Sequence, residues 1–191
     1  MKQALVLLIS AVLAGCMPRT VERIDEGQQI DLSGRWNDTD SRLVAEELIR
    51  DAMSRPWLTD FLEIKVRRPT VIVGLVKNKT HELISTEIFI KDMEREFVNS
   101  GRVSVVQAGD ARDELRRERA DQQEFASPET VKKWGRERGA DFILQGVVNS
   151  IVDTMDKRKV VLYQVDLELI DIETNEKVWI GTKKIRKLIT N

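Results

Sequence analysis

Apolar and polar residues alternate along this chain with two different periods, and the first to appear is the period of a helix. Between residues 41 and 53 the apolar side chains recur every three or four positions, which places them on one helical face. They are Ala45, Leu48, Ile49, Ala52 and Met53. Asp40 or Ser41 is placed to cap this helix, and Pro56 interrupts it. A second, shorter amphipathic segment follows, with apolar side chains at Trp57, Leu58, Phe61 and Leu62.

The segment Thr70–Val76 changes the period and predicts the first strand. Its residues are apolar and mostly β-branched, and an unbroken apolar run is typical of a central strand that is covered on both faces. The polar residues 77–80 are predicted to form the loop that follows. A helix is predicted from Leu83 to Asn99, and a second strand from Val103 to Ala108.

The stretch from Asp110 to Phe125 is highly charged and has few apolar residues. It is predicted to be either a solvated helix or a partly mobile segment that crosses the domain. Ser127 and Pro128 then fit the N-cap and first position of a further helix, which is predicted to end at Gly139.

The last third of the chain is predicted to form three strands. The first is Phe142–Val152, and the other two, Val160–Asp171 and Lys177–Leu188, form a hairpin with a turn at residues 173–176. In Val160–Asp171 apolar and polar residues alternate, which predicts one buried and one wet face. The order of elements predicts a single α/β domain with a mixed β-sheet, flanking helices and a C-terminal antiparallel hairpin.

The N-terminus has the features of a bacterial lipoprotein signal. Lys2 precedes the apolar run 4–12, which is too short to span a bilayer, since a spanning helix needs about 20 residues. Its length and flanks fit a signal-peptide core. The run ends at Leu13-Ala14-Gly15-Cys16, which resembles the lipobox of lipoprotein-processing enzymes. We therefore expect residues 1–15 to be removed and a lipid to be attached to the sulfur of Cys16.

The residues after Cys16 predict where the domain acts. Met17 rather than an aspartate follows the cysteine, which in the sorting rule of many diderm bacteria favours the outer membrane, here its periplasmic face. Residues 16–30 are predicted to be a short tether, because they are polar and show no period. A flexible coil of about 14 residues averages roughly 20 Å from end to end. The domain, residues 31–191, is therefore expected to lie close to its membrane.

The charge content narrows the range of partners, and the cysteine content narrows the ways in which the domain can be stabilised. The chain has 31 basic and 32 acidic residues, whereas a nucleic-acid-binding protein usually has a basic excess or a basic face. No nucleic acid is therefore expected as a partner. Cys16 is the only cysteine, so the mature domain is expected to have no disulfide and to be stable through packing alone.

The sequence lacks the residue patterns of common enzymes and metal sites. The one histidine, His81, cannot by itself found a zinc site, which needs three or four clustered ligands. The chain contains no G-x-S-x-G or S-x-x-K motif, and its glycines are too isolated to form a phosphate-binding loop. The protein is therefore predicted not to be an enzyme. We expect no cofactor other than the covalent lipid on Cys16, and no small-molecule substrate.

Residues 31–41, with the sequence DLSGRWNDTDS, resemble the opening block of the LpoB family, lipoproteins that activate penicillin-binding proteins. Weaker features agree with it at residues 71–74 with 78–80, 100–102, 138–141 and 176–179. Together they span about residues 31–185. Related TolB-N-terminal-like and CsgG-like periplasmic domains share this layout.

The resemblance implies a TolB-N-terminal-like α/β fold and a task, which is to dock on a bifunctional class A penicillin-binding protein and stimulate its peptidoglycan synthesis allosterically. The long tether of enterobacterial members is not found here, since about 14 residues reach only about 50 Å when fully extended.

Two alternatives stay open. One is a structural or assembly lipoprotein of an outer-membrane or secretion complex related to CsgG, and the other is a periplasmic hydrolase that uses carboxylates alone.

Four side chains are candidates for contact with a protein partner. They are Arg35, Trp36, Asn78 and Thr80. Aromatic and arginine side chains are enriched at protein interfaces. The alternative for these residues is structural: Trp36 packs under the sheet, and Asn78 or Thr80 satisfies backbone groups of a turn.

Overall fold

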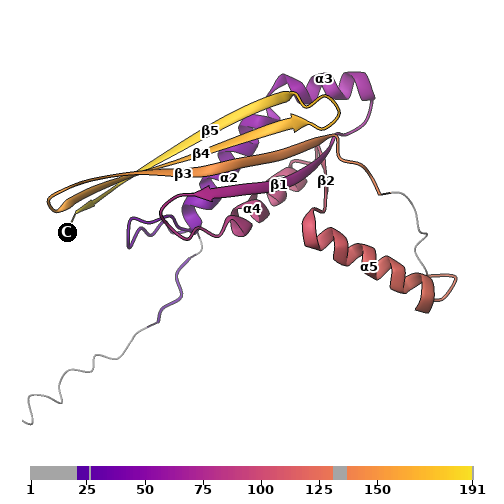
Figure 1. Cartoon of the computed structure of the whole chain (residues 1–191), viewed down its shortest axis with the longest axis horizontal. Helices are drawn as coiled ribbons and strands as arrows, with labels where there is room; N and C mark the ends of the chain where they lie inside the picture. The colour runs from indigo at the N-terminus through magenta and orange to yellow at the C-terminus, as the bar shows by residue number, and fades with distance from the viewer. Residues whose placement is uncertain (1–20, 26, 131–136, 191) are drawn as a thin grey trace, which may run out of the picture.

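The computed structural model describes residues 21–25, 27–130 and 137–190. The predicted signal peptide, Cys16 and the first part of the predicted tether lie outside the described residues. The helices are α2 (Asp38–Met53), α3 (Pro56–Lys65), α4 (Thr86–Ser100) and α5 (Gly109–Phe125). The strands are β1 (Thr70–Lys79), β2 (Ser104–Val106), β3 (Phe142–Met155), β4 (Arg158–Asp171) and β5 (Lys177–Thr190) (Figure 1).

The strands form one mixed sheet in the order β2-β1-β3-β4-β5. Strand β1 runs parallel to β2 and β3, and β3, β4 and β5 form an antiparallel meander. The prediction of a single α/β domain with a mixed sheet and a C-terminal hairpin is confirmed. No helix in the described part of the chain is long and apolar enough to cross a membrane.

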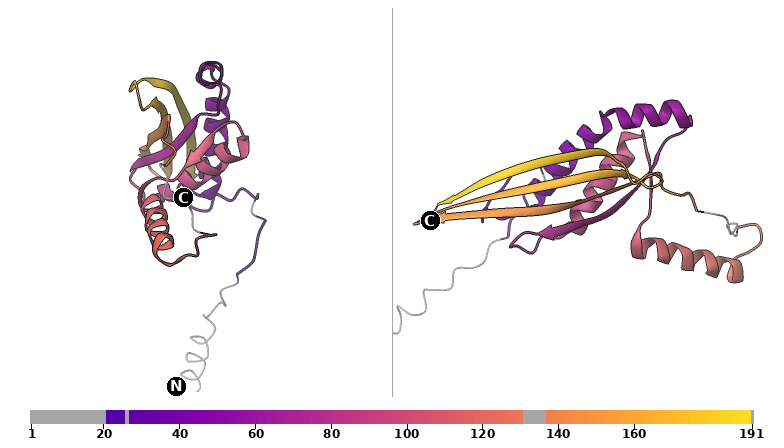
Figure 2. Two further views of the ribbon diagram at one scale, coloured as in Figure 1. Left: turned by 90° about the vertical axis from the view of Figure 1, so that its right-hand side faces the viewer. Right: turned by 45° about the horizontal axis from the view of Figure 1, so that its top comes forward.

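Helices α2 and α4 lie on one face of the sheet, and the core lies between them and that face (Figures 1 and 2). Every second residue of β4 from Val161 to Leu169 is buried there, as the predicted alternation required. Val44, Leu48, Phe89, Met93 and Phe97 are buried opposite them. Helix α5 instead projects from the domain, and none of its residues is buried (Figure 1).

The prediction that both faces of β1 are covered is wrong. Ile72 is only half-buried, and Leu75 is 62% exposed. The strand also continues to Lys79, so the prediction of a loop at residues 77–80 is wrong as well. Residues 77–79 pair with residues 147–149 of β3, and their polar character reflects an exposed part of the sheet rather than the end of the strand.

A helix cap and a predicted helix also differ from the sequence prediction. Helix α2 is capped by Asn37 rather than by Asp40 or Ser41, because the Asn37 side chain accepts from the Asp40 N–H while the Asp40 carboxylate accepts from the Asn37 N–H. The helix predicted from Ser127 to Gly139 is not found at either end. Residues 128–130 form a turn and residues 137–139 have no regular structure, while residues 131–136 lie outside the described part.

Candidate functional site

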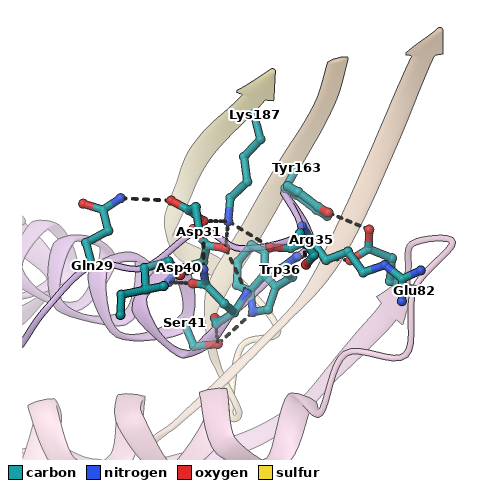
Figure 3. A network of polar contacts seen from close by, with 12 residues as sticks. Gln29, Asp31, Arg35, Trp36, Asp40, Ser41, Glu82, Tyr163 and Lys187 are labelled. Atoms are coloured by element: carbon teal, nitrogen blue, oxygen red, sulfur yellow. Dashed lines mark hydrogen bonds and ion pairs between the residues drawn. The ribbon is translucent and has the colours of Figure 1, made fainter. Parts of the chain in front are cut away.

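The polar segment before α2 crosses one end of the sheet and is held there by Lys187 of β5. The Lys187 ammonium lies 2.6 Å from carboxylate oxygens of both Asp31 and Asp40, and it donates to the carbonyl oxygen of Arg35 at 2.9 Å (Figure 3). Asp40 is only 4% exposed. Gly34 takes a left-handed backbone with φ of +66°, and it lies so close to the Ile189 side chain that an added Cβ would clash with it.

These charges are mutually stabilised. Burial alone would lower the pKa of Lys187, but its hydrogen bonds to Asp31 and Asp40 outweigh this and raise the pKa above its usual range. The hydrogen bond from Lys187 likewise holds the pKa of Asp31 below its usual range. The ammonium and the carboxylate of Asp31 therefore stay ionised near neutral pH.

Trp36 is fixed by its backbone, its indole N–H and its ring. Its backbone N–H donates to Glu82 Oε2 at 3.1 Å, and its Nε1–H donates to Ser41 Oγ at 2.7 Å. The ring packs edge-on against Tyr163, with centroids 5.5 Å apart, and against Phe89 at 6.5 Å. Such edge-to-face arrangements are favourable because the rim of one ring meets the electron-rich face of the other. Trp36 is thus part of the packed domain.

Glu82 joins this segment to the centre of the sheet. Its Oε1 accepts a hydrogen bond of 2.7 Å from the Tyr163 hydroxyl, while its Oε2 holds the Trp36 backbone. Burial, and then the hydrogen bond to the Glu82 carboxylate, raises the pKa of Tyr163 well above its usual range. Tyr163 therefore keeps its proton and acts as a permanent hydrogen-bond donor.

The loop after β1 holds Glu82 in place. The Asn78 side chain donates to the Glu82 carbonyl oxygen at 2.8 Å and accepts from the Thr80 N–H at 2.9 Å. The Glu82 N–H in turn donates to Thr80 Oγ1 at 3.1 Å. Asn78 and Thr80 therefore satisfy backbone groups of this turn. His81 is exposed beside them.

Three of the four predicted partner-binding residues thus meet around Glu82, and the fourth, Arg35, lies next to them. The Arg35 side chain is exposed and forms no hydrogen bond within the described residues, although its carbonyl oxygen is held by Lys187 (Figure 3). Trp36, Asn78 and Thr80 have the structural contacts named above. Their contact with a partner stays a prediction.

The residues that organise this site, Glu82, Tyr163 and Lys187, were not predicted. Tyr163 had a usable signal, since it is the only tyrosine of the chain and falls on the buried side of an alternating strand, where its hydroxyl needs a partner. The sequence signal for Lys187 was weaker: it lies on the same side of β5 as the buried Trp179.

The site has the composition of a structural or docking surface. The groups around Glu82 are a phenol that keeps its proton, amides, a hydroxyl and an indole. Among the described residues, no group of histidine, cysteine and carboxylate side chains could hold a metal ion. The absence of a cofactor stays a prediction.

The opposite end of the sheet is closed by a second charged pair. The Arg67 guanidinium contacts both carboxylate oxygens of Asp141, at 2.6 and 2.8 Å, and the Thr70 N–H donates to Asp141 at 2.7 Å. Trp57 and Phe61 of α3 pack edge-on against Phe142, and a groove of about 520 Å³ lies beside them, between α3 and the β4–β5 turn.

Comparison with known proteins identifies one matching family and several similar solved structures. A family model described as the peptidoglycan-synthase activator LpoB matches residues 40–185. A search of the curated proteins found no match. Among solved structures, the LpoB C-terminal domain from Escherichia coli is 16% identical, with 74% of this chain and 97% of that chain covered and a TM-score of 0.41.

Two other solved structures are similar at the same level. The LpoB C-terminal domain from Salmonella enterica is 17% identical, with 68% of this chain and 93% of that chain covered and a TM-score of 0.35. Lipoprotein GNA1162 from Neisseria meningitidis is 15% identical, with 63% and 83% covered and a TM-score of 0.42. The family assignment rests on the family model alone.

Proposed function

Because this chain belongs to the LpoB family of peptidoglycan-synthase activators, we propose that it binds a bifunctional class A penicillin-binding protein and activates it allosterically from the outer membrane. The observation that carries the proposal is the match of the family model to residues 40–185. The match includes Asn78 and Thr80 and begins just after Arg35 and Trp36.

The geometry around Glu82 supports Arg35 as an anchor for the partner. Its backbone is held on one side by Lys187, and the next residue, Trp36, is held by Glu82. The exposed guanidinium is therefore presented from a fixed backbone, which lowers the entropy lost when it binds. A guanidinium binds carboxylates in a two-pronged geometry, so we expect an acidic group of the synthase as its counterpart. Activation follows if this contact is stronger in the active state of the synthase than in the inactive one.

The proposed location depends on Cys16. We propose that its sulfur carries the lipid and that residues 16–30 tether the domain to the periplasmic face of the outer membrane. Mass spectrometry of the N-terminal peptide from cell envelopes tests this directly. An acylated peptide that begins at Cys16 is expected, and a peptide that still carries residues 1–15, or an unmodified Cys16, would contradict it.

The activation itself is tested by glycan-strand polymerisation. Each class A synthase of the host is assayed with the purified protein and lipid-linked disaccharide precursor, and at least one is expected to polymerise faster. No change with any of them would refute the proposed function. If the protein instead forms a ring of copies in light scattering and stimulates no synthase, the assembly role is supported.

The same assay tests Arg35. Arg35→Ala is expected to weaken stimulation, with the half-maximal concentration raised at least about fivefold, because buried arginine anchors contribute 1 kcal/mol or more to binding. The matched control is Arg68→Ala, at the opposite end of the sheet, which is expected to leave stimulation unchanged. Equal effects of the two substitutions would remove Arg35 from the proposed interface.

A further inference from the structure

The three long strands reach beyond the helices at the end where the N-terminal segment is attached (Figures 1 and 2). There the side chains alternate between the face that bears the helices and the open face of the sheet. The register places Ile151 beside Leu162, Val160 between Asp153 and Leu188, and Met155 beside Arg158. All of these side chains lie on the open face, because their strand neighbours Val161 and Tyr163 are buried under the helices.

This end of the open face is unusually apolar for an exposed surface. Ile151 is 66%, Met155 76% and Leu188 65% exposed, and the half-buried Val160 and Leu162 lie between them. We refer to these five residues as the tip patch. Clustered apolar side chains with this exposure indicate an interaction surface.

The tip patch is bordered by positive charge. The basic residues that border it are Lys157 and Arg158 in and after the β3–β4 turn, and Lys184 and Arg186 on β5. None of these four residues forms an ion pair within the described residues. Three other lysines of β5, Lys177, Lys183 and Lys187, do form ion pairs. The acidic residues at this tip are Asp153 and Asp156, so the local balance is positive.

The chain leaves the domain toward its N-terminus at this same end. Gly34 packs on Ile189 and Asp31 binds Lys187, and both of these β5 residues lie within a few positions of the strand's end, opposite the β3–β4 turn. Residues 21–25 lie farther from the sheet (Figure 1). If Cys16 carries the proposed lipid, the short tether therefore starts at the same end of the sheet as the tip patch, from the face that bears the helices.

We propose that the tip patch rests on the surface of the membrane that holds the lipid anchor, with its apolar side chains at the headgroup boundary and its basic side chains on anionic lipid headgroups. This inference rests on the lipid anchor of the proposed function and not on the identity of the synthase. It fixes the orientation of the domain: the groove beside α3 and the projecting α5 face away from the membrane.

The chemistry of the patch favours a lipid surface as its occupant. Surfaces that combine apolar side chains with lysine and arginine bind membranes through buried apolar area together with attraction to anionic lipids. Each basic residue near such a surface strengthens binding about fivefold. A single weak contact of this kind is enough here, because a tether of about 14 residues keeps the patch at high local concentration beside the bilayer.

The test uses the mature lipidated protein in preformed vesicles of phosphatidylcholine, with and without phosphatidylglycerol. If the sulfur of Cys16 is acylated, an introduced cysteine provides the one free thiol. A fluorophore is attached to Thr190→Cys beside the patch, or to Thr174→Cys in the β4–β5 turn at the opposite end. Quenching by a lipid-borne quencher is expected at position 190 in phosphatidylglycerol vesicles, less of it at high salt, and none at position 174.

Substitutions in the patch separate its charge from its apolar part. Lys184→Glu/Arg186→Glu is expected to reduce the quenched fraction at position 190 at least about fivefold, and Met155→Ser/Leu188→Ser is expected to reduce it severalfold without a change in charge. The matched control is Arg68→Glu/Arg117→Glu, which alters the net charge equally at the opposite end of the molecule and is expected to change nothing.

Different results would contradict the lipid anchor and the membrane contact of the tip patch. Protein that does not sediment with any vesicles would overturn the lipid anchor and the inference that rests on it. Protein that sediments but is quenched equally at positions 190 and 174, or responds equally to the patch and control substitutions, would overturn the membrane contact alone. Absent quenching at position 190, together with lost synthase stimulation in Lys184→Glu/Arg186→Glu, would assign the patch to the protein partner instead.

Discussion

The two ends of the sheet are closed in similar ways but with different burial. At one end, which we call the tether end because the predicted tether precedes it in the chain, Lys187 joins Asp31 and Asp40. At the opposite end Arg67 joins Asp141. Each charged pair is accompanied by aromatic rings packed edge-on. The Lys187 and Asp40 side chains are only 9% and 5% exposed, however, whereas the Arg67 side chain is 49% exposed.

This difference in burial predicts how much stability is lost at each end when one partner of its ion pair is substituted. A buried charge that loses its partner stays desolvated without compensation, which costs far more than the pair itself contributes. A half-exposed charge that loses its partner is rehydrated. The tether end is therefore expected to be the more sensitive one, although both ends contain a well-formed ion pair.

The largest effect is expected from Lys187→Met. This substitution keeps the length and the apolar stem but leaves the buried Asp40 carboxylate without its ammonium. The free energy of unfolding is expected to fall by about 3 kcal/mol, the lower part of the range for a broken buried pair. Urea denaturation at pH 7 measures it. Lys184→Met, three residues earlier on the same strand and without an ion pair, is the matched control and is expected to change stability by less than about 0.5 kcal/mol.

A result that removed the contrast would change the interpretation of this end. If Lys187→Met and Lys184→Met were equally mild, the ammonium would not be compensating a buried charge. Segment 31–37 would then be held by the packing and hydrogen bonds of Trp36 and by the packing of Gly34 on Ile189.

The tether end also shows where sequence reasoning stops. The periodicity of Val160–Asp171 predicted its buried face correctly, because the period of a strand is a local property. The bond from Lys187 to Asp40 joins residues 147 positions apart, and it depends on where segment 31–37 crosses the sheet, which no local period encodes. For the same reason Trp36 was recognised as a residue of interest while its acceptor Glu82 was not.

The errors on β1 have a related cause. Its unbroken apolar run was interpreted as a strand covered on both faces, yet the open face of the sheet leaves Leu75 exposed. Whether a second layer of helices covers a sheet depends on segments elsewhere in the chain. Here helix α5 could have covered it, but its charged sequence has too little apolar surface to pack, and α5 projects from the domain.

A smaller effect is expected from Tyr163→Phe at the same end. The substitution keeps the ring against Trp36 and removes only the hydroxyl that donates to Glu82, while the Trp36 N–H still binds that carboxylate. A loss of about 1.5 kcal/mol is expected in urea denaturation, since hydrogen bonds to charged groups contribute about 1.5–3 kcal/mol and Glu82 keeps one donor. Tyr163→Leu, which removes the ring as well, should be clearly worse. No measurable loss in Tyr163→Phe, together with a large loss in Tyr163→Leu, would show that packing and not the hydrogen bond fixes Glu82.

The opposite end is expected to tolerate the equivalent change better. Arg67→Met removes the guanidinium but leaves Asp141 with the Thr70 N–H, and the carboxylate is only partly buried. A loss of about 1 kcal/mol is expected, because a half-exposed ion pair with good two-pronged geometry lies at the upper end of the surface range. A loss as large as that of Lys187→Met would refute the proposed contrast between the two ends.

The smallest effect is the pH dependence of that same pair, and it has a definite sign. Burial alone would raise the pKa of Asp141, but the hydrogen bonds from Arg67 and from the Thr70 N–H outweigh it and hold the pKa below its usual range. A carboxyl with a lowered pKa in the folded state stabilises that state above the unfolded pKa of about 3.9. This contribution is lost as the pH falls through the folded pKa, when Asp141 is protonated.

The difference in unfolding free energy between the wild type and Arg67→Met is therefore expected to be constant from about pH 7 to about pH 5 and to shrink below about pH 4. Urea titrations at a series of pH values measure it. A difference that stayed constant down to about pH 2 would mean that Arg67 acts through its packing on Phe61, whose ring lies 5.1 Å from the guanidinium carbon, and not through the charge of Asp141.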